Sequence, residues 1–215
     1  MSSTNGQNKR FLLGAGLILI VWSCTIFPNQ ENPPIHTYVL ALEAPSLAHW
    51  PSCSSRHGTL LVNLPREEAG FDTPRIAYLM RPFEVKYYAY NRWAESPGRL
   101  LFPLLVQGIA RTDCWNHVSP SNPGAASAYR LDTEILEWQQ EFFGGPNRMR
   151  LSIRAQLVQT DNRQVIAVKN FEVVKKTPSS DAYGAVMATN QGVEELLMEM
   201  AQWIKTQAVT GKLGP

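Results

Sequence analysis

The strongest constraint on the fold is an alternation of residue types between positions 129 and 176. In LSIRAQL (151–157), apolar side chains occupy every second position and polar ones stand between them. Successive side chains of a strand point to opposite faces, so this period of two predicts strands with one covered face. The turn segments FFGGPN and Asp161-Asn162 divide the stretch into three long strands. We therefore expect an antiparallel sheet with one solvated face.

Shorter elements precede this stretch. Residues 36–42 and 58–64 are short apolar or β-branched runs bounded by proline and serine, as is typical of strands. Residues 75–93 alternate as a pair of strands, and Pro82 separates the two. Residues 98–110 are apolar at helical spacing and too densely apolar for a surface helix, which predicts a buried helix.

The C-terminal segment 179–207 predicts a second helix. It begins with serine and aspartate, which favour helix N-caps, and it then shows apolar residues at helical spacing. These are Tyr183, Val186, Val193, Leu196, Leu197, Met200 and Ile204. Strands with two helices of matching apolar faces predict an α+β fold, namely a two-layer domain with a mostly antiparallel sheet of about five to six strands and two main helices.

Near the N-terminus, an apolar run (11–22) follows Lys9 and Arg10. A helix needs about 20 apolar residues to cross a bilayer, so this run is short for an anchor. A basic segment followed by a short apolar one is typical of an export signal. An uncleaved anchor, or a cysteine that belongs to a protein core, is the alternative interpretation.

The end of this run, Ser23-Cys24, resembles the lipobox of bacterial lipoproteins. The resemblance implies cleavage before Cys24 and acylation of that cysteine. It also implies an outer-membrane destination, because Thr25 rather than aspartate follows. The expected organisation is a signal peptide (1–23), a tether (24–35), a single periplasmic α+β domain (36–209) and a tail (210–215).

The charge balance excludes some partners. The chain has 20 Lys and Arg against 18 Asp and Glu, and removal of residues 1–23 takes away Lys9 and Arg10 but no acid. The remaining chain is neutral and lacks a basic cluster. This argues against nucleic acid, whose binding depends on neutralising phosphates, and against a polybasic lipid-binding patch.

Motifs for catalysis do not occur in the sequence. A Gly-x-Ser-x-Gly elbow, a His-Glu-x-x-His helix and a phosphate loop are all missing. We therefore expect neither an enzymatic activity nor a cofactor.

Five cysteine and histidine residues form two short groups: His49, Cys53 and His57, then Cys114 and His117. With Cys24 acylated, an oxidising compartment favours a disulfide between the two remaining thiols. Two unpaired thiols are a second alternative. A zinc site built from both groups is a third, weakened because neither group contains Cys-x-x-Cys.

The segment RIAYLMRPFEVKYYAYNRWAESPGRLL resembles the auxiliary lipoproteins of MCE-type ABC transport systems, the group that includes paraquat-inducible protein C. In that family, a tyrosine-bearing strand leads into an Arg-Trp-Ala-Glu turn before the first helix. Here Arg92-Trp93-Ala94-Glu95 occupies that place. The later segments YRLDTEILEWQQEF and RLSIRAQLV and the terminal helix follow in the same order, so the resemblance spans residues 36–205.

The resemblance implies a non-enzymatic accessory part of a lipid transporter, anchored on the periplasmic side of the outer membrane. Its implied partners are an MCE-domain periplasmic subunit, a permease and an ATPase. The implied fold is similar to the N-terminal domain of TolB, with Trp93 as a core anchor and Arg92 or Glu95 fixing the turn. Open sheet edges would also allow a homo-oligomer. The alternative function is a free-standing carrier of lipid or another hydrophobic ligand, which would need a pocket for an acyl chain.

Overall fold

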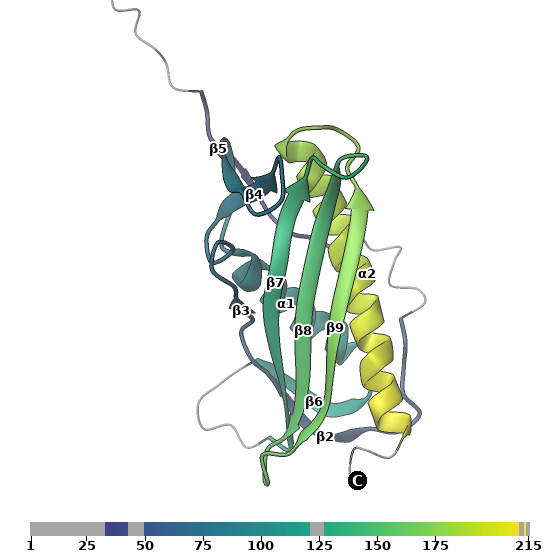
Figure 1. Ribbon diagram of the computed structural model, residues 1–215. Helices are drawn as coiled ribbons and strands as arrows, with labels where there is room; N and C mark the ends of the chain where they lie inside the picture. Colours follow the sequence, from purple (N-terminus) through teal and green to yellow (C-terminus); the bar gives the residue numbers. More distant parts are fainter. Residues whose placement is uncertain (1–32, 43–49, 121–126, 211–212, 214–215) are drawn as a thin grey trace, which may run out of the picture. The chain divides into compact units, whose positions relative to one another are not determined.

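The computed structural model describes residues 33–42, 50–120, 127–210 and 213. From Ile35 onward these residues form one compact unit, in which long strands cross in front of a long helix (Figure 1). The strands are β1 (His36–Tyr38), β2 (His57–Val62), β3 (Arg66–Glu67), β4 (Arg75–Leu79), β5 (Val85–Trp93), β6 (Trp115–Pro120), β7 (Tyr129–Glu141), β8 (Arg148–Gln159) and β9 (Val165–Lys176). The helices are α1 (Pro97–Ala110) and α2 (Ala182–Val209).

All nine described strands belong to one mixed sheet organised around β7. On one side β7 pairs with β8 in antiparallel register, and β9 continues the sheet beyond β8 in the same way. On the other side β2, β3 and β4 each pair with part of β7 in parallel. β5 is antiparallel to β4, while β1 and β6 lie in parallel beside β5 and β2.

The α+β class is confirmed, but the expected strand number and the mostly antiparallel pairing are wrong. Among the described residues the sheet has nine strands, and five of its eight pairings are parallel. The additional strands β3 and β6 are short, so they carry too few residues for a period of two to be recognised. The strand expected over residues 36–42 covers only His36–Tyr38.

The three longest strands, β7 to β9, are those that the alternation predicted. Leu151, Ile153 and Leu157 are buried, whereas Arg154 is exposed. Burying each fully covered aliphatic side chain stabilises the fold by roughly 1.5–3 kcal/mol relative to exposure. The alternation therefore gives the sheet one apolar face, which packs in the core, and one polar face.

Helix α2 covers this apolar face. Its N-cap is Asp181, whose side chain accepts a hydrogen bond from the backbone N–H of Gly184 at 2.8 Å. Gly192 lies against Leu151, at a position where a Cβ atom would come within 2.8 Å of the leucine side chain. Of the apolar series expected to face the core, Tyr183 is instead exposed, although its neighbours Ala182 and Gly184 are buried.

Helix α1 occurs where the sequence predicted a buried helix. It begins at Pro97, whose missing N–H costs nothing in a first turn. Leu101, Leu105 and Ile109 are buried on its inner side. Neither helix of the described residues has both the length and the apolar character needed to cross a membrane.

Candidate docking surface

Two of the predicted site residues, Cys24 and His49, lie outside the described residues. The other two cysteines, Cys53 and Cys114, are joined by a disulfide with a Cα–Cα distance of 4.9 Å. Of the three alternatives for these thiols, the structure contains the bridge. The backbone N–H of Cys53 also donates to the carbonyl of Thr112 at 2.8 Å, so the bridge ties the loop before β2 to the end of α1.

The two predicted histidines that the structure describes, His57 and His117, do not form a metal site with the cysteines. His57 is buried, with its ring 6.2 Å from that of Trp115, and His117 is exposed on β6. Within the described ranges, no group of three His, Cys, Asp or Glu side chains is placed to hold a metal ion. The bridged sulfurs of Cys53 and Cys114 are not thiolates, which zinc would require.

The family-like turn lies between β5 and α1. Trp93 is almost fully buried, and its backbone N–H donates to the carbonyl of Pro74 at 2.7 Å. Arg92 is exposed and donates from Nε to the hydroxyl of Thr37 at 3.4 Å, while Glu95 is exposed. Trp93 therefore packs in the core, whereas the side chain of Glu95 does not hold the turn.

The carboxylate that fixes this turn belongs to Glu67 in β3, which the sequence did not indicate. Glu67 accepts hydrogen bonds from the backbone N–H of Gly98 at 2.7 Å and from the hydroxyl of Ser96 at 3.0 Å. Burial raises the pKa of Glu67, and the two hydrogen bonds oppose that rise. A residue 31 positions away in sequence thus caps α1, and no local pattern could have revealed it.

The most exposed apolar feature is the turn between β4 and β5. We define the hairpin tip as Met80, Phe83 and Val85, all of which are exposed. Phe83 is fully exposed and has a φ of 68°. A bulky residue rarely adopts this left-handed conformation, which costs roughly 1–2 kcal/mol. The backbone thus holds an aromatic ring in solvent at an energetic cost.

Charged residues lie next to the hairpin tip and form ion pairs with one another. Glu84 pairs with Arg81 at 2.7 Å and with Lys86 at 3.5 Å. The hydrogen bond from Arg81 is the main cause that lowers the pKa of Glu84. The apolar tip is therefore flanked by two cations and one carboxylate.

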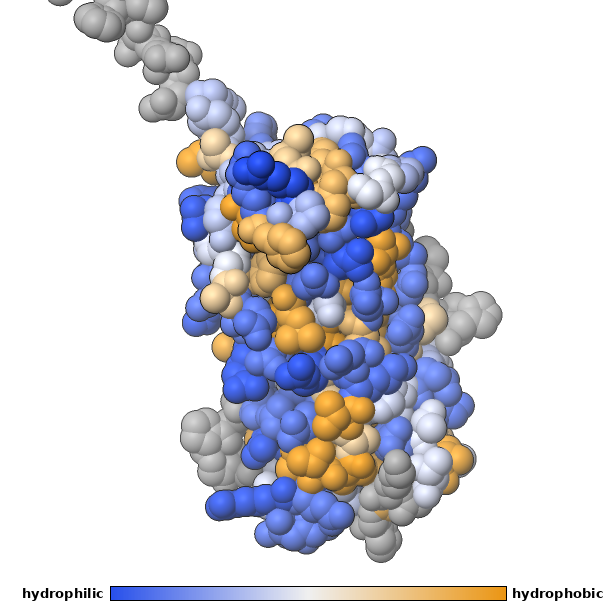
Figure 2. Space-filling model, in the orientation of Figure 1, coloured by the Kyte–Doolittle hydropathy of each residue, from blue (hydrophilic) through white to orange (hydrophobic). Residues whose placement is uncertain are grey.

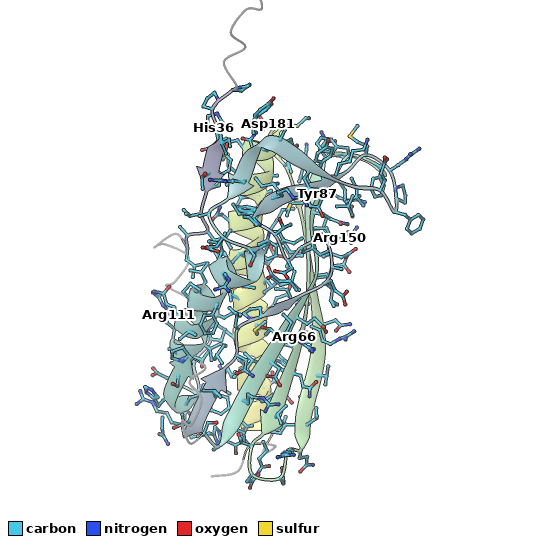
Figure 3. The ribbon with its side chains drawn as sticks, turned by 90° about the vertical axis from the view of Figure 1, so that its left-hand side faces the viewer. His36, Arg66, Tyr87, Arg111, Arg150 and Asp181 are labelled. Carbon is cyan, nitrogen blue, oxygen red and sulfur yellow. A yellow bond between two sulfur atoms is a disulfide. The ribbon has the colours of Figure 1, made fainter. Side chains whose placement is uncertain are left out.

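The base of the hairpin is fixed by aromatic contacts. The ring of Tyr78 lies 4.8 Å from that of Tyr88 and 5.9 Å from that of Phe142. The hydroxyl of Tyr88 donates to Gln140 at 2.7 Å, and burial raises the pKa of Tyr88 to about 12. On the other face, the hydroxyl of Tyr87 (labelled in Figure 3) donates to the carbonyl of Gly70 at 2.9 Å. These contacts therefore hold the strands of the hairpin in place, while the hairpin tip is exposed to solvent.

The first strand of the domain runs in the same direction as β5, which is away from this tip. β1 runs parallel to β5, with His36 opposite Asn91 and Tyr38 opposite Trp93. Because β5 starts at the tip and runs away from it, the residue preceding His36 lies on the tip side. His36 and Tyr87 accordingly lie toward the same end of the domain in Figure 3.

The outer face of the sheet, which points away from α2, is rich in charge. Two linked sets of ion pairs lie on it: the first joins Arg148, Arg150, Glu141 and Glu172 of the long strands, and the second joins Arg66 of β3 to Glu134, which also pairs with Arg154. Figure 2 shows this face as hydrophilic, with separate apolar patches between the charges.

Among the apolar residues of the outer face are Val168 and Val174 of β9, which are 54% and 44% exposed. Within the described residues, β9 pairs only with β8, so its other edge is open. An open edge next to exposed apolar side chains is a surface suited to a protein partner.

Two pockets on the described surface are shallow. One, of ≈ 350 Å³, lies between β9 and α2 and is lined by Lys169, Glu199, Gln202, Trp203 and Thr206. The other, of ≈ 360 Å³, is lined by Asn63, Leu64, Arg66, Arg130, Asp132, Thr133 and Gln156. Both are open and carry charged walls, unlike the mostly apolar, enclosing sites that bury a hydrophobic ligand.

Comparison with solved structures identifies the fold. Protein XCC0632 from Xanthomonas campestris, of family DUF330, has 21% identity and a TM-score of 0.68, with 83% of this chain and 99% of that chain covered. Protein CT253 from Chlamydia trachomatis has 8% identity and a TM-score of 0.53, with 72% and 99% covered. No curated protein matches the sequence.

The family is established by sequence. The model of the family "ABC-type transport auxiliary lipoprotein component" matches residues 38–201, which run from the end of β1 into α2. This match covers well over half of the chain, including the hairpin tip, the turn at Trp93 and the three long strands. The chain belongs to the family of ABC-type transport auxiliary lipoprotein components.

Proposed function

We propose that this protein is a membrane-anchored periplasmic accessory lipoprotein of an MCE-type ABC lipid transport system. It is held by acyl chains on Cys24 at the periplasmic side of the outer membrane. There it docks the periplasmic MCE-domain subunit, which works with a permease and an ATPase. Its role is recognition rather than turnover. The observation that carries the proposal is the family match over residues 38–201.

The outer sheet face supports a docking role. Fixed ion pairs such as Arg154 with Glu134 give a surface a defined charge pattern, which favours one partner over another. Val168 and Val174 add apolar area beside the open edge of β9. We assign this face to the MCE-domain subunit of the transporter.

The lipid anchor makes a modest docking surface sufficient. Residues 24–36 can extend at most about 40 Å at 3.3–3.6 Å per residue. The domain is therefore confined to a thin layer beside the bilayer, which raises its effective concentration for a partner that reaches the same layer. The shallow, charged pockets favour this role over that of a free-standing lipid carrier.

Co-purification tests the proposal. The tagged, full-length protein is captured from gently solubilised membranes, and its companions are identified by mass spectrometry. We expect enrichment of the MCE-domain subunit, permease and ATPase over a control lipoprotein. If none of the three is enriched, and deletion of the gene leaves membrane permeability to detergents unchanged, the transporter role is wrong.

A matched pair of variants tests the docking face. The double change Val168→Glu and Val174→Glu places charges on the outer face and should reduce capture of the MCE-domain subunit at least tenfold. Val209→Glu makes the same chemical change at a valine that is 71% exposed at the end of α2, and should leave capture unchanged. Equal capture by both variants would remove the outer face from the proposal.

The open edge of β9 also allows pairing between copies of this chain. The molar mass of the purified, solubilised protein measures such pairing. A mass of several chains that falls to one chain in the double variant would place the contact on β9.

A further inference from the structure

We propose that the hairpin tip, Met80, Phe83 and Val85, inserts into the interfacial region of the lipid bilayer that holds the acyl anchor. The tip is thus a second membrane contact, separate from the lipidated N-terminus. This inference rests on the lipid anchor of the proposed function.

The first argument is the conformation of Phe83. Its ring is fully exposed although its φ of 68° is unfavourable for a bulky side chain. The ring gains no burial within the described domain, so the domain itself does not explain the conformation. An apolar environment outside the domain would receive the ring and supply that burial.

The second argument is the direction from which the chain arrives, and it favours a bilayer over a protein. The parallel pairing of β1 with β5 places Ile35, the first residue of the domain, on the side of His36 that faces the tip. From Asn91 back to Val85, β5 spans about 20 Å at ~3.3 Å per residue. The tether of residues 24–36 can span about 40 Å. The tip and the acyl chains can therefore reach the same bilayer surface at the same time.

The third argument is the chemistry around the tip. Arg81 and Lys86 flank the apolar side chains, and both form ion pairs with Glu84. Long cationic side chains reach phosphate groups while apolar neighbours lie about 5–10 Å deep at the acyl boundary. A lipid interface provides both environments, with phosphates outside and hydrocarbon inside.

The opposite end of the sheet provides an internal control. β9 begins at Val165, which is 46% exposed. Val165 lies opposite Val158 in β8, near the end of β8 that pairs with the start of β7, whereas the tip lies beside the other end of β7. An exposed valine at Val165 should therefore remain in water when the tip is in the bilayer.

The experiment uses the full-length lipidated protein in vesicles of phosphatidylethanolamine and phosphatidylglycerol. Because Cys24 is acylated and Cys53 is bridged to Cys114, one introduced cysteine is the only free thiol. Met80→Cys and Val165→Cys are each labelled with a polarity-sensitive dye, and quenching by nitroxide-labelled lipids is measured. We expect at least twofold quenching at position 80 and none at position 165.

Two further results decide the inference. Adding Phe83→Ser to the Met80→Cys protein should abolish the quenching if Phe83 drives insertion. Equal, water-like emission from dyes at positions 80 and 165 would overturn the inference. Emission that shifts to the blue in native membranes without quenching by nitroxide lipids would also overturn it, in favour of a protein partner.

The proposed function is tested separately. If the dye at position 80 stays in water while the tagged protein still captures the MCE-domain subunit, the membrane contact fails and the docking role stands. If the dye is quenched but no transporter subunit is captured, the tip binds lipid and the docking role fails.

Discussion

The two ends of the central strand β7 are stabilised in different ways. Near its first residue, Tyr129, β7 pairs with β2, which pairs with β6, and the disulfide between Cys53 and Cys114 joins the segments that precede β2 and β6. Near its last residue, Glu141, the neighbouring β4–β5 hairpin is held by aromatic contacts, carries ion pairs in its turn and exposes its apolar tip.

This difference indicates that the disulfide end contributes to the stability of the fold, whereas the hairpin end is available for contact with other molecules. The disulfide end closes a long segment of chain and buries its aromatic residues, such as Trp115. The hairpin end fixes its base but leaves Phe83 in solvent. We therefore expect substitutions at the first end to affect folding and those at the tip to affect binding.

The largest effect on stability is expected at the disulfide end. The bridge joins residues separated by 61 positions. For a loop of this length, the chain-entropy model gives about 4 kcal/mol. Cys53→Ser with Cys114→Ser should lower the free energy of unfolding by this amount, measured in urea.

Intact mass after alkylation provides the control for this prediction. The unreduced protein should take up no alkylating agent at these two cysteines. Two modified thiols without reductant, or a loss of stability below about 1 kcal/mol, would show that the end is not closed covalently in solution.

The next largest effect is expected at Glu141, whose side chain is only 4% exposed. It accepts hydrogen bonds from Arg148 at 2.7 Å and Arg150 at 2.8 Å. Glu141→Ala should lower the free energy of unfolding by about 2–3 kcal/mol, somewhat below the cost of breaking a fully buried pair because both arginines are partly exposed. Glu172→Ala, which removes an exposed partner of Arg150, should cost less than about 1 kcal/mol.

The pH dependence sharpens this prediction. Burial raises the pKa of Glu141, but the hydrogen bonds from Arg150 and Arg148 outweigh it and hold the pKa below its usual value. The carboxylate therefore contributes stability above its unfolded pKa and loses it as the pH falls through its folded pKa. The difference between wild type and Glu141→Ala should shrink below about pH 4. A constant difference from pH 7 to pH 3 would contradict this.

A smaller effect is expected between the two ends, at Glu67. Glu67→Ala removes the acceptor of the Gly98 N–H and should cost about 1–2 kcal/mol at pH 7. Glu67→Gln keeps an acceptor oxygen and should cost less. Because burial raises the folded pKa of Glu67, wild-type stability should fall relative to Glu67→Gln as the pH rises from the unfolded pKa through the folded one. The opposite slope in urea titrations would mean that the two hydrogen bonds outweigh burial in setting this pKa, and a cost of Glu67→Ala below about 0.5 kcal/mol would refute the assigned cap.

The smallest effect on stability is expected at Phe83. Phe83→Ser should change the free energy of unfolding by no more than about 0.5 kcal/mol, as for other exposed positions. Phe83→Gly should stabilise the domain by roughly 0.5–1 kcal/mol, because glycine adopts a φ of 68° without strain. Thermal unfolding measures both. A loss above about 1 kcal/mol would mean that the ring packs within the domain.

A contrast between long, regular elements and short ones explains how much of the fold could be predicted from the sequence. Elements with many residues in a regular pattern were predictable, such as β8 with its period of two and α2 with its helical period. The short strands β3 and β6 were not, because their positions depend on pairing with residues far along the chain. The parallel pairings of β7 likewise arise from tertiary contacts that no local pattern encodes.

For the candidate site, the sequence was informative about residue types but not about placement. Trp93 was expected in the core and is buried there. Glu67 was missed because it caps a helix across 31 positions. The exposure of Phe83 was missed because the alternation in residues 83–89 suggested that it lies within a strand, whereas it lies in the turn before Val85.

Site-specific photocrosslinking in living cells tests most directly whether the sheet docks the transporter while the tip contacts lipid. A benzophenone amino acid replaces Val174 on the outer sheet face or Phe83 at the tip of the full-length protein. We predict that position 174 yields an adduct with the MCE-domain subunit, while position 83 yields lipid adducts and no protein adduct. An adduct with the MCE-domain subunit from position 83, and none from position 174, would contradict both assignments.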